Sequence, residues 1–248
     1  MQTTMPSTPS LVPDSLSPSS FASSLNMPHL PFADSWPACA AKASIVLYGG
    51  SFDPPHLGHL AVSETAQRAL RADEVWWLVS PQNPLKPRPS LPLAERLRRA
   101  QALLRRPRMR ALALEQALGT RYAIDTLRAL QAHYPAVRFV WLLGADAMAD
   151  LHRWKDWDAL MRRVPLAVYP RAGATVRAGL SPAARRFQRT RRKGAAAARL
   201  AHLAPPAWLM LPAPLTPWSS RSLRARQQTA PRTTPKTASK TAKDRRAA

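Results

Sequence analysis

Short apolar segments alternate with segments of helical periodicity through the middle of the chain, and this alternation limits the fold more than any other feature. The apolar segments are rich in Val, Leu and Trp, as expected of strands buried on both faces of a sheet. The expected strands are 43–48 (ASIVLY), 75–79 (VWWLV), 108–114, 138–143 (RFVWLL), 165–169 (PLAVY) and 208–211. The expected helices are 57–71, 91–105, 122–133, 154–161, parts of 180–201, and 219–228. The pattern predicts an α/β fold of Rossmann type, with a mainly parallel sheet covered by helices on both faces.

The two ends of the chain differ in composition from the middle. Residues 1–42 are rich in Ser, Pro and Thr without periodicity, which predicts a disordered N-terminal extension; a start codon assigned too far upstream would produce the same segment. Residues 229–248 are predicted to form a basic disordered tail. The chain has 248 residues, of which 46% are hydrophobic, so residues 43–228 suffice for one α/β domain.

The chain is strongly basic, with a formal net charge of +23. Such a surface attracts anions, whether ATP, phosphorylated metabolites or nucleic acid, although a GC-rich genome that favours Arg and Ala would also produce it. The single cysteine, Cys39, excludes a disulfide framework and a cysteine-based zinc site. With no apolar run of the roughly 18 residues that span a membrane and no signal peptide, we expect a cytoplasmic protein without membrane association.

The residues that follow the first expected strand have the character of a phosphate site. The segment 49–60 reads GGSFDPPHLGHL, so two glycines allow a tight turn, and the next helix directs its N-terminal N–H groups at the same place. His56 and His59 are three residues apart and share one side of the first helical turn. Two imidazoles at a helix N-terminus predict a site for a polyphosphate at the carboxyl end of the sheet, where ligands of such folds bind.

The motif HxGH, and the longer string GGSFDPPHLGHL, resemble the nucleotidylyltransferase superfamily and, within it, the nicotinate-nucleotide adenylyltransferase family. The resemblance extends over about residues 43–226, so 43–228 is expected to be a nucleotidylyltransferase domain. It implies that His56 and His59 are catalytic. It also implies an ATP site that includes Gly50, Ser51, Phe52, Asp53, His56 and His59.

Two further motifs resemble ATP-binding segments of the family. Gly144-Ala145-Asp146 matches a family GxD, in which Asp146 accepts hydrogen bonds from ribose hydroxyls. The segment 218–224 (WSSRSLR) resembles the family's ISSTxIR, so Ser220 and Arg224 are expected to hold phosphates. Arg221 stands in place of the usual Thr, and its role is left open.

Other matches imply a site for the mononucleotide. Asn83 and Lys86 hold the places of a family Asn and a basic residue after the second strand, and Arg171 follows the fifth. The segment 121–127 (RYAIDTL) resembles the family's SYTIDTL. There, backbone N–H groups at Tyr122, Ala123 and Ile124 would hold the nicotinate carboxylate, although Ala123 lacks the hydroxyl of the usual Thr. Trp154 is expected to stack on the pyridine ring.

The resemblance implies an in-line displacement in which the phosphate of nicotinate mononucleotide attacks the α-phosphorus of ATP, giving deamido-NAD and pyrophosphate. The nucleophile is already an anion, so catalysis reduces to alignment and charge stabilisation. Mg²⁺ is expected to accompany ATP, held largely by phosphates and water. The expected partners are ATP and nicotinate mononucleotide, and no nucleic acid is expected to bind. The protein is expected to be a monomer or a small homo-oligomer.

Three other functions are compatible with parts of this sequence. A related HxGH adenylyltransferase would use nicotinamide mononucleotide or another phosphorylated metabolite such as pantetheine phosphate. The Trp154 region and RYAIDTL argue against pantetheine phosphate. A class I aminoacyl-tRNA synthetase would be longer and would carry a lysine-rich KMSKS-like loop. A basic RNA-binding protein would interleave aromatic and basic residues on a sheet face, which this sequence does not do.

Overall fold

A computed structural model of the chain describes residues 36–82, 85, 89 and 91–214. Within them, a seven-stranded sheet has the order β3-β2-β1-β4-β5-β7-β6, and its ladders are all parallel. The strands are β1 (Ser44–Gly50), β2 (Glu74–Val79), β3 (Met109–Leu112), β4 (Arg138–Gly144), β5 (Leu166–Tyr169), β6 (Arg191–Arg192) and β7 (Trp208–Met210). The predicted α/β class with a parallel sheet is confirmed.

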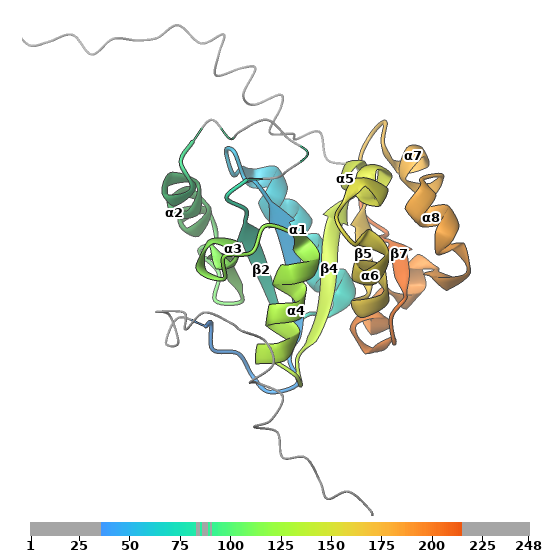
Figure 1. Cartoon of the computed structure of the whole chain (residues 1–248), viewed down its shortest axis with the longest axis horizontal. Helices are drawn as coiled ribbons and strands as arrows, with labels where there is room; N and C mark the ends of the chain where they lie inside the picture. The colour runs from blue at the N-terminus through green and yellow to red at the C-terminus, as the bar shows by residue number, and fades with distance from the viewer. Residues whose placement is uncertain (1–35, 83–84, 86–88, 90, 215–248) are drawn as a thin grey trace, which may run out of the picture. The chain divides into compact units, whose positions relative to one another are not determined.

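Helices connect the strands and cover the sheet (Figure 1). The α-helices are α1 (Leu57–Leu70), α2 (Leu93–Leu103), α3 (Leu114–Ala117), α4 (Ala123–His133), α5 (Ala145–Asp150), α6 (Trp157–Arg163), α7 (Thr175–Gly179) and α8 (Pro182–Arg186). The 3-10 helices are η1 (Leu151–Arg153), η2 (Gln188–Thr190) and η3 (Gly194–His202).

The alternation of side chains along β1 separates two layers of core. Val46 and Tyr48 belong to a buried cluster that includes side chains of α1, α2 and η3, so these helices cover one face. The opposite face receives Ile45 and Leu47, which are fully buried, and α4 and α6 lie over it in Figure 1. Both faces of the central strands are therefore covered, which is why these strands are apolar throughout.

The chain reverses the direction in which it adds strands at β1. From β1 it proceeds to β2 and β3 on one side and then returns to β4 on the other side of β1. The chain segments that follow β1 and β4, after Gly50 and Gly144, therefore leave neighbouring strands in different directions. Open α/β sheets bind their ligands at such a switch point.

Two sequence expectations about element ends are wrong. The helix expected from residue 154 begins at Trp157, because Trp154 has extended backbone angles after the 3-10 turn η1. The strand expected to run to residue 114 ends at Leu112, and Leu114 begins the short helix α3. The expectation did not include α3, α5, α7 and β6, whose few residues carry little periodicity. The terminal helix expected at 219–228 lies outside the described residues.

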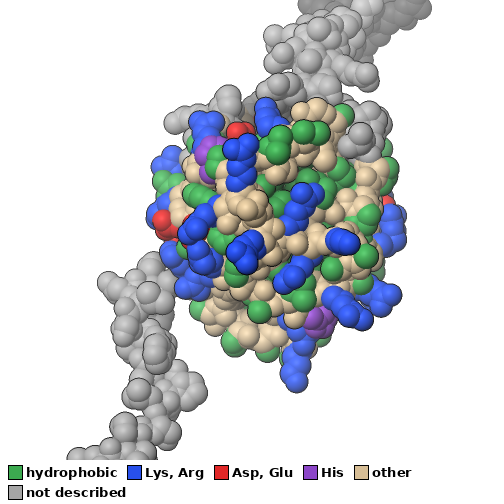
Figure 2. Space-filling model, turned by 90° about the vertical axis from the view of Figure 1, so that its right-hand side faces the viewer, with side chains coloured by type: hydrophobic (Ala, Val, Ile, Leu, Met, Phe, Trp, Pro, Cys, Tyr) green, Lys and Arg blue, Asp and Glu red, His purple; other side chains and the backbone are tan. Residues whose placement is uncertain are grey.

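The face that carries α7 and α8 is densely basic (Figure 2). Lys and Arg outnumber acidic side chains there, and residues 185–193 alone include six exposed basic side chains: Arg185, Arg186, Arg189, Arg191, Arg192 and Lys193. The positive charge is thus a property of the folded domain. None of the described helices is both long enough and apolar enough to span a bilayer.

Candidate active site

The two histidines of the HxGH motif cap helix α1 with their own side chains. Nδ1 of His56 accepts a hydrogen bond from the Gly58 N–H at 3.1 Å, and Nδ1 of His59 accepts one from the His56 N–H at 3.3 Å. This is the reciprocal arrangement of a capping box, here made by two imidazoles. Because Nδ1 is an acceptor in both rings, the ring proton of each lies on Nε2.

The pKa of His56 is lowered to about 4, mainly because burial disfavours the charged ring and secondarily because the Arg171 guanidinium repels it. His56 is therefore a neutral N–H donor at physiological pH. The two rings lie close together, tilted by 30°, with their centroids 3.8 Å apart.

Aromatic side chains fix the position of His59. Its ring centroid lies 4.9 Å from that of Phe52, 5.8 Å from that of Trp77 and 6.2 Å from that of Tyr48. Only 9% of His59 is exposed. The ring has little freedom to rotate, so the direction of its Nε2–H is set before any substrate binds.

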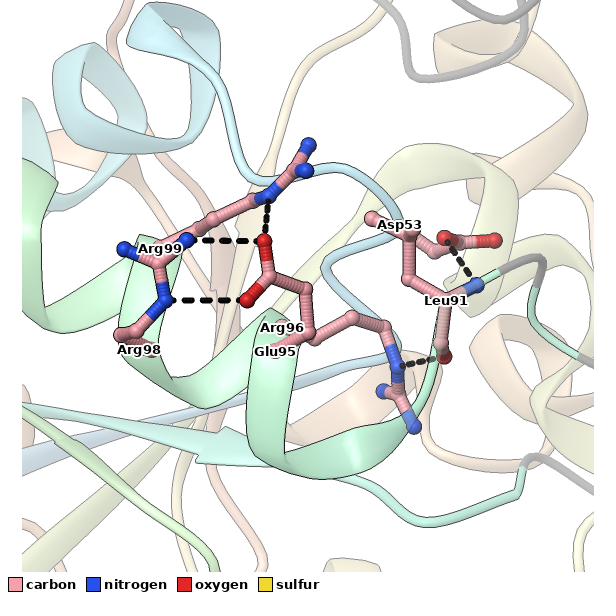
Figure 3. Close-up of polar contacts among 6 residues, drawn as sticks. All are labelled: Asp53, Leu91, Glu95, Arg96, Arg98 and Arg99. Atoms are coloured by element: carbon pink, nitrogen blue, oxygen red, sulfur yellow. Dashed lines mark hydrogen bonds and ion pairs between the residues drawn. The ribbon is translucent and has the colours of Figure 1, made fainter.

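The loop between β1 and α1 is held by the side chains of Phe52 and Asp53. Phe52 has φ of +46° and stacks on Trp77 with the ring centroids 4.6 Å apart. Asp53 is buried, and its Oδ1 accepts a hydrogen bond from the Leu91 N–H at 3.3 Å (Figure 3). The side chain of Phe52 belongs to the core, so only its backbone is left for the predicted contact with ATP.

A buried arginine that the sequence analysis did not single out joins this loop to the next one. The guanidinium of Arg96 donates to the carbonyl oxygens of Ser51 (2.6 Å), Ser80 (2.8 Å), Pro81 (3.1 Å) and Leu91 (3.0 Å). Figure 3 shows it pointing from α2 toward Leu91, away from the exposed pair of Arg98 with Glu95. Arg96 thus fixes the carboxyl ends of β1 and β2 relative to one another. The sequence feature that could have revealed this role is the position of Arg96 on the apolar side of α2, four residues before the buried Ala100.

Arg171 and Asp146 lie together beside the histidines. Nε of Arg171 lies 3.4 Å from Oδ1 of Asp146, and the guanidinium acts electrostatically on both His56 and the buried hydroxyl of Tyr48. A Cβ on Gly144 would come within 2.8 Å of Arg171 Nε, so the absence of a side chain there admits the pair. The structure places Arg171, expected on the mononucleotide side, among the residues expected to bind ATP.

A pocket opens beside the glycines of β1 and contains the residues expected around the pyridine ring. Tyr122, Ala123 and Trp154 line it together with Gly49 and Gly50. The remaining lining residues are Ser80, Leu85, Glu115, Arg121, Trp141, Leu143, Ala147, Arg153 and Lys155. The pocket thus joins segments that are more than a hundred residues apart in sequence.

The N-terminus of α4 lies at this pocket. Tyr122 is the N-cap residue, and its carbonyl already accepts the N–H of Asp125 at 3.0 Å. The N–H groups of the first helical residues, Ala123 and Ile124, have no acceptor within the helix. The side chain of Ile124 is fully buried in the core, so only its backbone can serve a ligand.

Lys155 is positioned at one wall of the pocket by two contacts. Its Nζ lies 3.4 Å from Oδ2 of Asp125 and 4.8 Å from the centre of the Tyr122 ring.

Four expected site residues, Asn83, Lys86, Ser220 and Arg224, lie outside the described residues.

Comparison with known proteins identifies the family of the chain. A family model described as cytidylyltransferase-like matches residues 47–226. A protein of Cereibacter sphaeroides named a probable nicotinate-nucleotide adenylyltransferase is 52% identical over 179 residues, covering 72% of this chain and 95% of the relative. One of a Caulobacter strain with the same name is 50% identical, covering 73% of this chain and 96% of the relative.

The chain belongs to the nicotinate-nucleotide adenylyltransferase family. Two solved structures of the nicotinic acid mononucleotide adenylyltransferase of Plasmodium falciparum share the fold. One, complexed with NaAD, has a TM-score of 0.56 and the other, complexed with APC, one of 0.53. Each is 16% identical and covers 74% of this chain and 83% of its own, so this likeness concerns the fold alone.

Proposed function

We propose that this adenylyltransferase transfers AMP from ATP to nicotinate mononucleotide, giving deamido-NAD and pyrophosphate. The observation that carries the proposal is the pair of imidazoles at the start of α1, each with Nδ1 occupied by a backbone N–H, beside a pocket lined by Tyr122, Ala123 and Trp154. The membership of the family, at about half identity over most of the chain, supports the same reaction.

In this reaction a phosphate oxygen of the mononucleotide attacks the α-phosphorus of ATP, and the bond to the bridging oxygen of pyrophosphate breaks. Negative charge on the α-phosphoryl oxygens is what the site has to stabilise. The Nε2–H groups of His56 and His59 supply donors that are fixed in direction in advance. The helix N-terminus behind them adds its positive dipole end.

The remaining assignments rest on the sequence motifs, and the positions of the described residues support some of them. Arg171, next to His56 and Asp146, would neutralise a phosphate oxygen, and Asp146 would accept a hydrogen bond from a ribose hydroxyl. Trp154, in the pocket with Tyr122, offers a flat face to the pyridine ring. Asn83, Lys86, Ser220 and Arg224 keep the phosphate-binding and substrate-binding roles that the sequence motifs predict.

We infer that Mg²⁺ enters with ATP and is held by phosphate oxygens and water. The described residues contain no cluster of three or more His, Cys, Asp or Glu side chains that could form a protein cage for a metal ion. When bound, the ion supplies neutralisation of the triphosphate charge. The oligomeric state and the cytoplasmic location stay predictions.

The direct test is to incubate the purified protein with ATP, Mg²⁺ and nicotinate mononucleotide and to identify the products chromatographically. Equal amounts of deamido-NAD and pyrophosphate are expected. Pyrophosphate release that requires pantetheine phosphate instead would assign the chain to another branch of the HxGH enzymes.

A further inference from the structure

A buried carboxyl group lines the pocket in which the pyridine ring is expected. Glu115, in α3, is 7% exposed, and its Oε2 is buried without a hydrogen-bond partner among the described residues. It borders the same pocket as Tyr122, Ala123 and Trp154. Burying a carboxyl oxygen without a hydrogen-bond partner costs free energy. Its position at a pocket wall therefore points to a ligand group that forms the missing hydrogen bond.

The surroundings of Glu115 favour its neutral form. Burial raises its pKa to about 7, and a hydrogen bond from the Ser80 side chain opposes this only in part. The charged side chains that border the same pocket are Arg121, Arg153 and Lys155. Lys155 is engaged by Asp125 and the Tyr122 ring, and Glu115 forms an ion pair with none of the three.

We propose that Glu115, as a neutral carboxylic acid, donates a hydrogen bond to the carboxylate of nicotinate mononucleotide and thereby selects the acid over the amide. This inference rests on the proposed function and adds a specificity-determining residue to it. An ionised Glu115 would repel the substrate carboxylate, so a proton has to be taken up when the acid binds. The amide has no charge and imposes no such requirement.

The proposal makes acid binding depend on pH and amide binding much less so. Above pH 7 more of Glu115 is ionised in the free enzyme, so affinity for the acid falls as the pH rises. Both mononucleotides carry the same phosphate group, whose own titration affects them alike. The difference between the two ligands therefore isolates the group that faces the ring substituent.

Isothermal titration calorimetry in buffers of different ionisation enthalpy measures this directly. At pH 7.5, nicotinate mononucleotide should bind with the uptake of a measurable fraction of a proton more than nicotinamide mononucleotide, since a group with a pKa of about 7 is partly ionised there. In Glu115→Gln the difference should vanish. In the control Asp158→Asn, which removes an exposed carboxylate of α6, it should stay as in the wild type.

The wild-type measurement stands whether or not the Glu115→Gln variant folds. Equal proton uptake with both mononucleotides would overturn the role of Glu115 alone, and would assign the countercharge to Arg121, Arg153 or Lys155. Failure of nicotinate mononucleotide to bind, together with no pyrophosphate release, would overturn the proposed function and this role with it.

Discussion

The backbone N–H of His56 donates to Nδ1 of His59 at 3.3 Å, so the second histidine of the motif fixes the first, and their rings lie 3.8 Å apart. The same contact that caps helix α1 decides which nitrogen of His59 carries the proton. Helix capping and the orientation of the two rings are therefore one structural feature here, and it uses an imidazole at both ends of the motif.

Replacing His59 with Ala should lower kcat by roughly 10²-fold or more, because one preorganised donor to the α-phosphoryl group is lost. Steady-state pyrophosphate release measures this, and circular dichroism checks that the variant is folded. His202→Ala, an exposed histidine at the end of η3, is the matched control and should turn over normally. Near-normal turnover in folded His59→Ala would remove this residue from the mechanism.

His56 should act as a neutral donor across the physiological range, since its pKa is lowered to about 4. With saturating substrates, kcat should show no step attributable to His56 between pH 6 and 8. The difference between wild type and His56→Asn in kcat should accordingly be the same at both pH values. A wild-type rate that rises as the pH falls through 6.5, and does not rise in the variant, would mean that the imidazolium is the active form.

The same lowered pKa has a consequence for stability with a definite sign. The unfolded chain takes up a proton on His56 near pH 6.5, whereas the folded chain does so only near pH 4. The contribution of the neutral ring is therefore present above pH 6.5 and is lost as the pH falls toward 4. Urea unfolding should show a shallower loss of stability over this range in His56→Asn.

Arg96 should be the most costly single arginine to remove from α2. Arg96→Met would leave four backbone carbonyls without their donor, and a loss of about 3 kcal/mol or more of unfolding free energy is expected. Arg98→Met, which breaks only an exposed pair with Glu95, should cost much less. Equal losses in urea unfolding would show that Arg96 does not hold the two loops.

Ala123→Thr should increase the preference for nicotinate over nicotinamide mononucleotide. Ala123 lines the pocket at the first position of α4, so a hydroxyl there can add a donor to the carboxylate. One charge-assisted hydrogen bond is worth about 1.5–3 kcal/mol, or roughly tenfold or more in the ratio of kcat/KM. Ala123→Ser serves as a second variant. An unchanged ratio in both would place the carboxylate away from this residue.

The central strands could be predicted from the sequence because each is apolar throughout and ends at a glycine or a polar loop. The sequence was also enough to place both HxGH histidines at the start of α1, where the structure has them. The short helices α3, α5 and α7 were not predicted because four to six residues carry no resolvable period. Three features of the site could not be predicted from the sequence: the capping hydrogen bonds, the link made by Arg96, and the burial of Glu115.

Arg171 shows why the neighbours of a site residue are hard to predict from sequence. In sequence it follows β5, far from the histidines, and the resemblance placed it near the mononucleotide. In the fold, the carboxyl ends of β1, β4 and β5 are neighbours, so Arg171 reaches Asp146 and His56. Strand order, which sequence periodicity does not contain, brings these residues together, and which substrate Arg171 binds stays a prediction.

The most direct test of the account is the ratio of kcat/KM for nicotinate and nicotinamide mononucleotide, measured by pyrophosphate release at pH 7 with saturating ATP. The N-terminal N–H groups of α4 and the positive end of its dipole favour a carboxylate over an uncharged amide. The account predicts at least about tenfold better use of the acid, the lower part of the range for one charge-assisted hydrogen bond, because Ala123 contributes no hydroxyl. Equal use of both substrates would contradict it and would make the protein a dual-specificity adenylyltransferase.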